Sequence, residues 1–163
     1  PDAIVNLEAD LPFQDAEFDL VVCTDVLEHI DRLHSLFDEL CRVSRRYVLI
    51  SLPNMYESYF RLRCLTGTYL NKYGLPVEPP ADRHRWFFKY EDARRFVLHN
   101  AGRNGFSVVR ELAYYNSYRR LLPMMITNLA RWLSLAPNLF ALTYWCVLEK
   151  QSDLRSEVDR HDS

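Results

Sequence analysis

Residues 18–53 contain two apolar runs separated by a segment with helical periodicity, and this order restricts the fold more than any other feature of the chain. The first run, 18–24, is rich in valine and carries Asp19 as its one charged residue before Thr24, which is typical of a strand buried on both faces. The second run, 47–52, is closed by Pro53. A strand, a helix and a strand at this spacing predict a parallel crossover and therefore an α/β fold.

The segment between the two runs has apolar residues at spacings of three and four, as an amphipathic helix requires. These residues are Leu33, Leu36, Phe37, Leu40 and Val43. Asp31 stands where it can cap the start of the helix. Arg42, Arg45 and Arg46 stand near its end, where the helix dipole favours cations.

The remainder of the chain predicts further elements that would complete the same sheet. We expect helices over 59–65, 90–101 and 119–135, with Gly102 in the C′ position of the second, and strands over 106–112 and 142–149. The connection 66–89 is much longer than the usual loops of α/β folds, so we predict that it acts as a lid over a binding site. The charged tail 151–163 is expected to be disordered.

Composition excludes several classes of protein. The chain of 163 residues has 20 basic and 22 acidic side chains, which argues against nucleic acid as a partner. Its four cysteines form no CxxC pair, so we predict buried thiols in a reducing, cytoplasmic location rather than disulfides or a metal site. Polar residues interrupt the longest apolar stretch, and we therefore expect no stable membrane insertion.

Four segments carry a resemblance to a known family. They are "LPFQDAEFDLVVCTDVLEH" at 11–29, "ELCRVSR" at 39–45, "DRHRWFFKYEDARRF" at 82–96 and "GFSVV" at 105–109. Their sequence and order resemble the class I S-adenosylmethionine-dependent methyltransferases, in the branch of type 11-like methyltransferase domains, over about two thirds of the chain.

The resemblance implies a partial Rossmann-like methyltransferase fold, with a mostly parallel sheet and flanking helices, that uses S-adenosylmethionine as cofactor. The family's GxGxG turn has no counterpart, because the glycines at 67, 74, 102 and 105 form no GxG. By resemblance, residues 1–150 are then an N-terminally truncated methyltransferase domain with an insert at about 55–89, and this fragment alone is expected to bind the cofactor poorly. The implied reaction is methyl transfer to oxygen or nitrogen of a small-molecule or glycan-type acceptor. A non-catalytic binding domain is the alternative.

Ligands of open α/β sheets bind beyond the carboxyl ends of the strands, and the residues that follow the two apolar runs are therefore site candidates. The resemblance assigns cofactor binding to Asn6, Asp10, Leu11, Thr24 and Asp25, and catalysis to His84 and His29. Acceptor binding is assigned to Arg83, Arg85, Asn54 and Tyr56. For each residue an ordinary structural role, such as capping, core packing or a solvated charge, stays open.

The stretch 119–148 is rich in Leu, Met and Trp. A core or dimer helix explains this composition better than a membrane-surface helix, which usually carries more lysine. The expected partners are therefore a small-molecule acceptor and, through this helix, a second copy of the chain in a homodimer.

Overall fold

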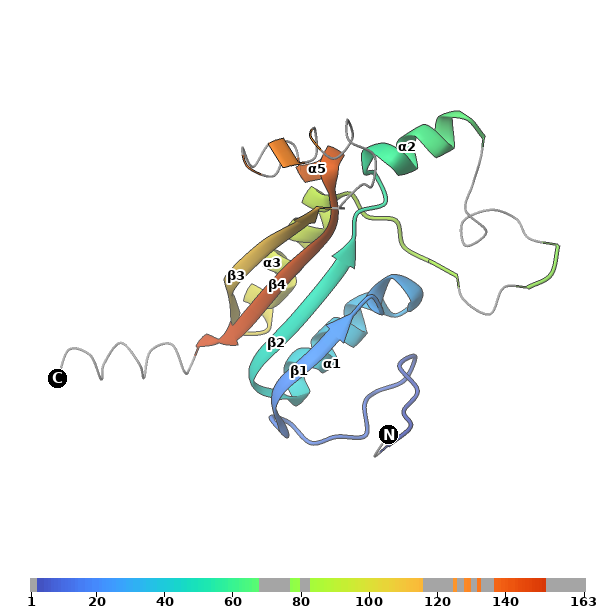
Figure 1. Ribbon diagram of the computed structural model, residues 1–163. Coiled ribbons are helices and arrows are strands. Elements are labelled where there is room, and N and C mark those ends of the chain that lie inside the picture. The colour runs from blue at the N-terminus through green and yellow to red at the C-terminus, as the bar shows by residue number, and fades with distance from the viewer. Residues whose placement is uncertain are drawn as a thin grey trace.

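Four strands form one sheet in the order β1-β2-β4-β3 in the computed structural model (Figure 1). The structure describes residues 3–67, 77–79, 83–115, 125, 128–129, 132 and 137–151. The strands are β1 (Phe18–Thr24), β2 (Ser44–Pro53), β3 (Phe106–Tyr115) and β4 (Ala141–Lys150). β1 is parallel to β2, whereas β4 is antiparallel to both of its neighbours, β2 and β3. Three of the four strands thus run in one direction, which confirms the predicted α/β fold with a mostly parallel sheet.

The predicted crossover is present as β1, the helix α1 (Leu33–Val43) and β2. All five apolar positions that predicted α1 are buried. The predicted cap is wrong, because Arg32 and not Asp31 is the N-cap residue of this helix. Glu8 satisfies the donors at the helix start, since its two carboxylate oxygens accept the backbone N–H groups of Asp31 and Arg32 at 2.9 and 3.3 Å. A carboxylate from a distant loop therefore replaces the local side chain that the sequence suggested.

A second long helix, α3 (Tyr90–Arg103), packs against β3 and β4. The prediction that Gly102 occupies the C′ position is wrong, since this residue is still helical. Asn104 is the C-cap and Gly105 follows with φ of 74°, the left-handed conformation that glycine adopts without strain. Three shorter helices complete the described part of the chain: η1 (Leu27–His29), α2 (Ser58–Leu65) and α5 (Pro137–Phe140).

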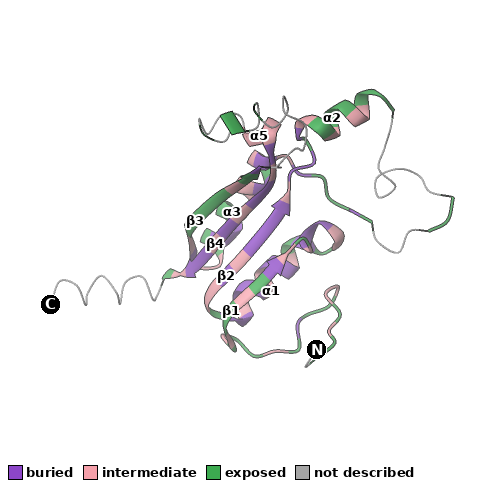
Figure 2. Ribbon diagram, in the orientation of Figure 1, coloured by how far each residue is buried: buried purple, intermediate pink, exposed green. Residues whose placement is uncertain are grey.

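The hydrophobic core lies between the sheet and the two long helices. Figure 2 shows buried residues running along β2 and β4. Their inward side chains, Val48, Ile50, Leu52, Tyr144, Cys146 and Leu148, are at most 2% exposed. The prediction that residues 18–24 are buried on both faces is wrong, because Leu20 and Val22 of β1 are more than half exposed, and so is Leu112 of β3. Both long helices therefore cover the same face of the sheet.

Several predicted segments lie partly or almost wholly outside the described residues. The predicted helix 119–135 and the tail after residue 151 lie almost wholly outside them, and so does most of the 66–89 connection. All four cysteines are free thiols; Cys23, Cys41 and Cys146 are buried as predicted, whereas Cys64 is half-buried. Within the described ranges, no helix combines the length and the apolar character that crossing a membrane requires.

Candidate functional site

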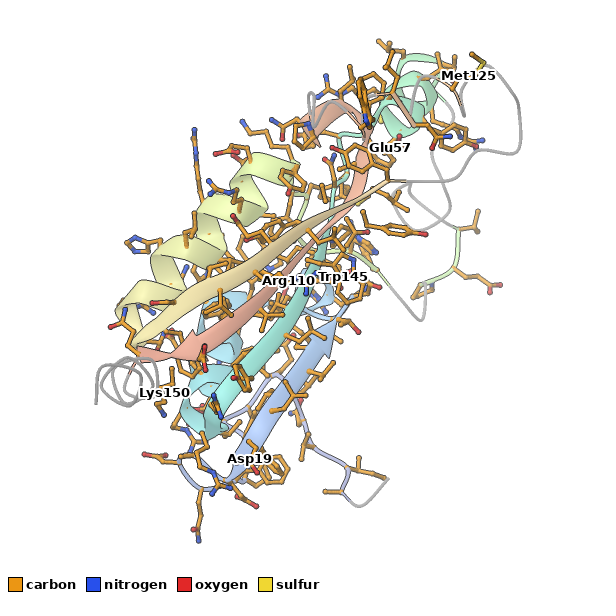
Figure 3. All side chains as sticks on the ribbon, turned by 60° about the vertical axis from the view of Figure 1, so that its left-hand side comes forward. Asp19, Glu57, Arg110, Met125, Trp145 and Lys150 are labelled. Atoms are coloured by element: carbon orange, nitrogen blue, oxygen red, sulfur yellow. The ribbon has the colours of Figure 1, made fainter. Side chains whose placement is uncertain are left out.

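The candidate site lies where β1 and β2 end, because η1 follows β1 directly and the segment before α3 passes close to it (Figure 1). Figure 3 places Glu57, which follows β2, at this end of the sheet, with Asp19 and Lys150 at the opposite end. Parallel strands leave their ligand-binding crevice at their carboxyl ends. The described residues at this edge are therefore the ones whose contacts define the site.

Residues 83–86, which we call the strap, are tied to the turn formed by residues 28–31. The backbone N–H groups of Arg85 and Trp86 donate to the carbonyl oxygen of Glu28 at 2.8 and 3.2 Å. The Trp86 indole N–H donates to the Ile30 carbonyl at 2.7 Å. Arg85 donates from Nε to the His29 carbonyl at 3.0 Å. These hydrogen bonds hold one end of the long connection against the end of β1.

The strap brings His84 into contact with Glu28 and His29. The two imidazole rings lie edge to face, with centroids 4.4 Å apart. His29 Nε2 is 3.7 Å from a Glu28 carboxylate oxygen, and His29 Nδ1 is 3.2 Å from the carbonyl oxygen of Arg83. Glu28 is 1% exposed and His84 8%, whereas the side chain of His29 is 23% exposed. This Glu28–His29–His84 cluster places a carboxylate and two imidazoles at the mouth of the site.

Asp25, which directly follows β1, adopts a backbone conformation that L-residues rarely take, with φ of 53°. Its backbone N–H donates to Ser51 Oγ at 3.0 Å, and the Ser51 hydroxyl donates to Asp25 Oδ1 at 3.1 Å. Ser51 is fully buried in β2, where it pairs with Thr24 across the parallel ladder. A buried hydroxyl thus holds a strained turn, and such strain is concentrated at functional sites.

An apolar cavity of about 380 Å³ opens beside the strap. It is lined by Met55, Tyr56, Phe60, Arg61, Cys64, Leu65 and Phe87. Helix α2 forms one wall and begins at a buried cap, because Glu57 accepts the backbone N–H groups of Tyr59 and Phe60 at 2.9 and 3.0 Å. The cavity is large enough for part of a small organic molecule.

Electrostatic contacts extend from the cluster into the core. Burial, with a further contribution from the Glu28 carboxylate, raises the pKa of the Cys23 thiol to about 12. Cys23 faces the core near the end of β1 and stays protonated at neutral pH. It is therefore an inert thiol rather than a nucleophile.

Three of the predicted cofactor residues have structural contacts. The side chain of Asn6 accepts the backbone N–H of Glu8 at 3.0 Å, and Asp10 forms an ion pair with Arg32 at 2.9 Å. Leu11 is 7% exposed in the core. Thr24 and Asp25 lie at the carboxyl edge of the sheet. The cofactor role of all five residues stays a prediction.

The four predicted acceptor residues differ in their surroundings. Tyr56 lines the cavity and Arg83 is exposed in the strap. Arg85 pairs with Asp31 at 2.6 Å. Asn54 is 3% exposed, and its Nδ2 lies 2.7 to 3.3 Å from three carbonyl oxygens of residues 137–141. The contacts of Arg85 and Asn54 stabilise the fold, and a binding role for either stays a prediction.

The site assignments made from the sequence leave out three residues of this region. Glu28 resembles an ordinary acid at a helix start, yet it is buried beside both predicted histidines. Ser51 lies inside an apolar strand, and a small polar residue in such a run is the one signal that marks it. Cys64 carries no local signal, because the cavity that it lines forms only through tertiary contacts.

The comparisons with known proteins agree with the fold and with the motif region. Residues 3–50 match the family model described as a methyltransferase domain. A search among curated proteins found no match. The matched segment and the fold thus resemble those of S-adenosylmethionine-dependent methyltransferases.

Three solved structures illustrate the likeness. One is the magnesium protoporphyrin IX methyltransferase of Synechocystis PCC 6803 with bound SAH, at 18% identity and a TM-score of 0.50, covering 90% of this chain and 49% of that one. The second, an S-adenosylmethionine-dependent methyltransferase of Methanosarcina mazei, has 15% identity and a TM-score of 0.53 over 91% and 66%. The third is the small RNA methyltransferase HEN1, with 16% identity and a TM-score of 0.56 over 89% and 15%. The chain thus spans about half to two thirds of the first two proteins, and the first and third are named for different acceptors.

Proposed function

We propose that the protein to which this chain belongs transfers a methyl group from S-adenosylmethionine to an oxygen or nitrogen atom of a small-molecule acceptor. The observation that carries the proposal is the contact of His84 with His29 at the carboxyl edge of β1. This contact brings two side chains that can accept a proton to the edge where a class I domain of this kind binds its ligands. The likeness of the fold to methyltransferases supports the same reaction.

The residues at the end of β1 fit one side of a cofactor pocket. Asp25 has a strained backbone that Ser51 holds in place, and Thr24 pairs with Ser51 in the ladder. We propose that Thr24 and Asp25 contact the cofactor. The sequence contains no GxG turn. The described residues therefore supply only the side of the proposed cofactor pocket that lies at the end of β1.

S-adenosylmethionine, when bound, supplies a methyl group on a positively charged sulfur. The residues of this chain would orient the acceptor and take its proton, which are the two contributions that an in-line displacement leaves to the protein. His84 is held by the strap and would accept the proton. His29, whose Nδ1 faces the Arg83 carbonyl, would position His84 through the ring contact.

The cavity beside the strap favours an acceptor with an apolar part. Its walls carry Met55, Phe60, Leu65 and Phe87, and Tyr56 adds a hydroxyl. An aromatic or aliphatic group would gain about 25 cal/mol for each Å² that it buries there. We propose a small molecule over a glycan for this reason, and the net charge of −2 supports neither RNA nor DNA.

The test is a methylation assay on the complete protein with isotope-labelled S-adenosylmethionine. The panel contains phenols, amines, glycans and RNA, and products are identified by mass spectrometry. Label on a phenol or an amine is the expected result. Cofactor binding by calorimetry without transfer to any class of acceptor would support the alternative of a non-catalytic binding domain.

We also infer the setting of the domain. Four free thiols support a reducing compartment such as the cytoplasm. We propose one domain over 1–150 with the insert at 55–89, and a homodimer stays a prediction.

A further inference from the structure

The Glu28–His29–His84 cluster has the composition of a metal site. One carboxylate and two imidazoles each offer a ligand atom, and these atoms all lie within 4.8 Å of one another. Two histidines with one carboxylate are a frequent donor set for divalent first-row metals, and such sets leave coordination positions open. The sequence alone predicts no metal site, because His84 is distant in the chain from the other two residues.

The orientation of His29 supports metal binding. Its Nδ1 lies 3.2 Å from the Arg83 carbonyl oxygen, which can only accept a hydrogen bond. We assign the ring proton to Nδ1 for this reason. Nε2 then carries the free lone pair, and Glu28 Oε1 lies 3.7 Å from it. A backbone carbonyl that fixes the tautomer in this way is a regular feature of metal-binding histidines.

The ligand atoms lie close enough together to converge on one shared cation. Metal bonds of about 2.1 Å in tetrahedral geometry place ligand atoms about 3.4 Å apart. His29 Nε2 and Glu28 Oε1 are 3.7 Å apart, which is near this value. The ligand atoms of the whole set all lie within 4.8 Å of one another, so side-chain rotation would have to shorten the longest separation by on the order of 1 Å.

The site is also built into the fold. Glu28 is 1% exposed and His84 8%, so packing restricts both side chains to few positions. The strap holds His84 in place through the bonds of Arg85 and Trp86 to the Glu28 carbonyl. The ligands therefore come from two segments that are fixed to each other without a metal.

We propose that Glu28, His29 and His84 bind a divalent first-row transition-metal cation such as Zn²⁺ or Co²⁺. One consequence rests on the proposed function: an imidazole whose lone pair binds a cation cannot accept a proton, so in the metal-loaded protein His84 would act as a ligand only. The cation would then orient an acceptor oxygen and favour the loss of its proton to solvent, which favours oxygen over nitrogen acceptors. Metal binding itself requires neither cofactor nor acceptor.

The direct test uses the complete protein, freed of metal and carrying no polyhistidine tag. Co²⁺ titration is followed by visible absorption and Zn²⁺ titration by calorimetry. We expect one cation per chain. Glu28→Gln, His29→Gln and His84→Ala should each weaken binding at least about tenfold. His99→Ala, which removes an exposed histidine of α3, should bind like the wild type.

A second measurement distinguishes a variant that has lost the metal site from a variant that does not fold. Zn²⁺ at a hundred times its dissociation constant should raise the melting temperature of the wild type and of His99→Ala by on the order of 5 °C. The His84→Ala protein, whose substitution lies in the strap outside the sheet, should show no such rise. Circular dichroism of each variant verifies its fold.

Two results would overturn the proposal. One is a wild-type protein that binds no stoichiometric cation, and the other is binding that survives all three ligand substitutions. The proposed function is tested separately by the labelled-methyl assay with and without EDTA. If the protein methylates an acceptor but binds no cation in either titration, the metal site is refuted and the proposed function is supported. If it binds the cation but methylates nothing, the proposed function is refuted and the metal site is supported.

Discussion

The imidazole ring of His84 packs edge to face against that of His29, with an interplanar angle of 77°. His29 belongs to the turn after β1, and His84 to the strap that precedes α3. Hydrogen bonds of Arg85 and Trp86 to the Glu28 carbonyl fix this relationship. The role of the His84 ring and the role of the hydrogen bonds that hold it in place can therefore be tested by separate substitutions.

Replacing His84 by alanine should lower turnover about a hundredfold or more, because a proton acceptor in the transition state contributes on that order. The dissociation constant for S-adenosylmethionine should change by less than about threefold, since His84 faces the acceptor in the proposed function. Single-turnover rates and calorimetry on the complete protein measure the two quantities. Wild-type turnover in this variant would remove His84 from the mechanism, and His99→Ala is the matched control.

Replacing Arg85 by alanine should loosen the attachment of the strap to residues 28–31. The substitution removes the ion pair with Asp31 and the hydrogen bond to the His29 carbonyl. Both side chains of the pair are about half exposed, so the pair itself should contribute less than about 1 kcal/mol to the free energy of unfolding. We expect a lower turnover number from the displaced His84 and a small change in stability.

Arg83→Ala provides the contrast, because Arg83 is exposed in the strap and is among the residues that the sequence assigns to acceptor binding, where its charge would attract an anionic group. This variant should raise the Michaelis constant with turnover unchanged. A raised Michaelis constant with unchanged turnover in Arg85→Ala would instead restore Arg85 as an acceptor ligand, as the sequence predicts.

Glu39 on α1 should make stability depend on acid pH. The hydrogen bond from Arg42 lowers the pKa of the Glu39 carboxyl below its ordinary value of 4.5, and the backbone N–H of Leu11 adds to this effect. A depressed pKa stabilises the fold fully above the ordinary value, and this contribution is lost as pH falls through the lower value of the folded state. Chemical denaturation between pH 7 and pH 3 should show this loss.

Glu39→Gln is the matched variant, because it keeps the size and one acceptor of the side chain. It should cost about 1–3 kcal/mol at pH 7 and little below the pH at which the wild-type carboxyl is protonated. Equal differences between the two proteins at every pH would contradict the role of Glu39.

Cys64 should be the first cysteine to react with alkylating reagents. Burial raises the pKa values of Cys23, Cys41 and Cys146 to about 12, from an ordinary 9.0. The thiolate fraction of these three at pH 8 is then about a thousandfold lower than that of an unperturbed thiol. Cys64 is half-buried and lines the cavity.

Mass spectrometry after brief iodoacetamide treatment identifies the labelled residue. An acceptor that occupies the cavity should slow the labelling of Cys64, and Cys64→Ser should remove the fast phase. Labelling of Cys23 at the same rate would contradict the burial that the structure gives it.

Local sequence determined the elements of the fold. Apolar runs and the three-four spacing of Leu33, Leu36 and Leu40 encode β1, α1 and β2, because elements with so many apolar residues are stable only when they are packed into a core. The order of these elements then leaves few topologies. The pattern also located the carboxyl edge of the sheet, where Thr24 and Asp25 lie.

Capping and the site depended on tertiary contacts instead. Glu8 rather than Asp31 satisfies the start of α1, since a backbone N–H donates to whichever carboxylate the folded chain brings close. Asn54 follows a strand like a ligand-binding residue, yet its amide is held by backbone carbonyls of a segment far along the chain. The meeting of Glu28, His29 and His84 has no counterpart in any local pattern, because it arises from hydrogen bonds between two segments that only the folded sheet places side by side.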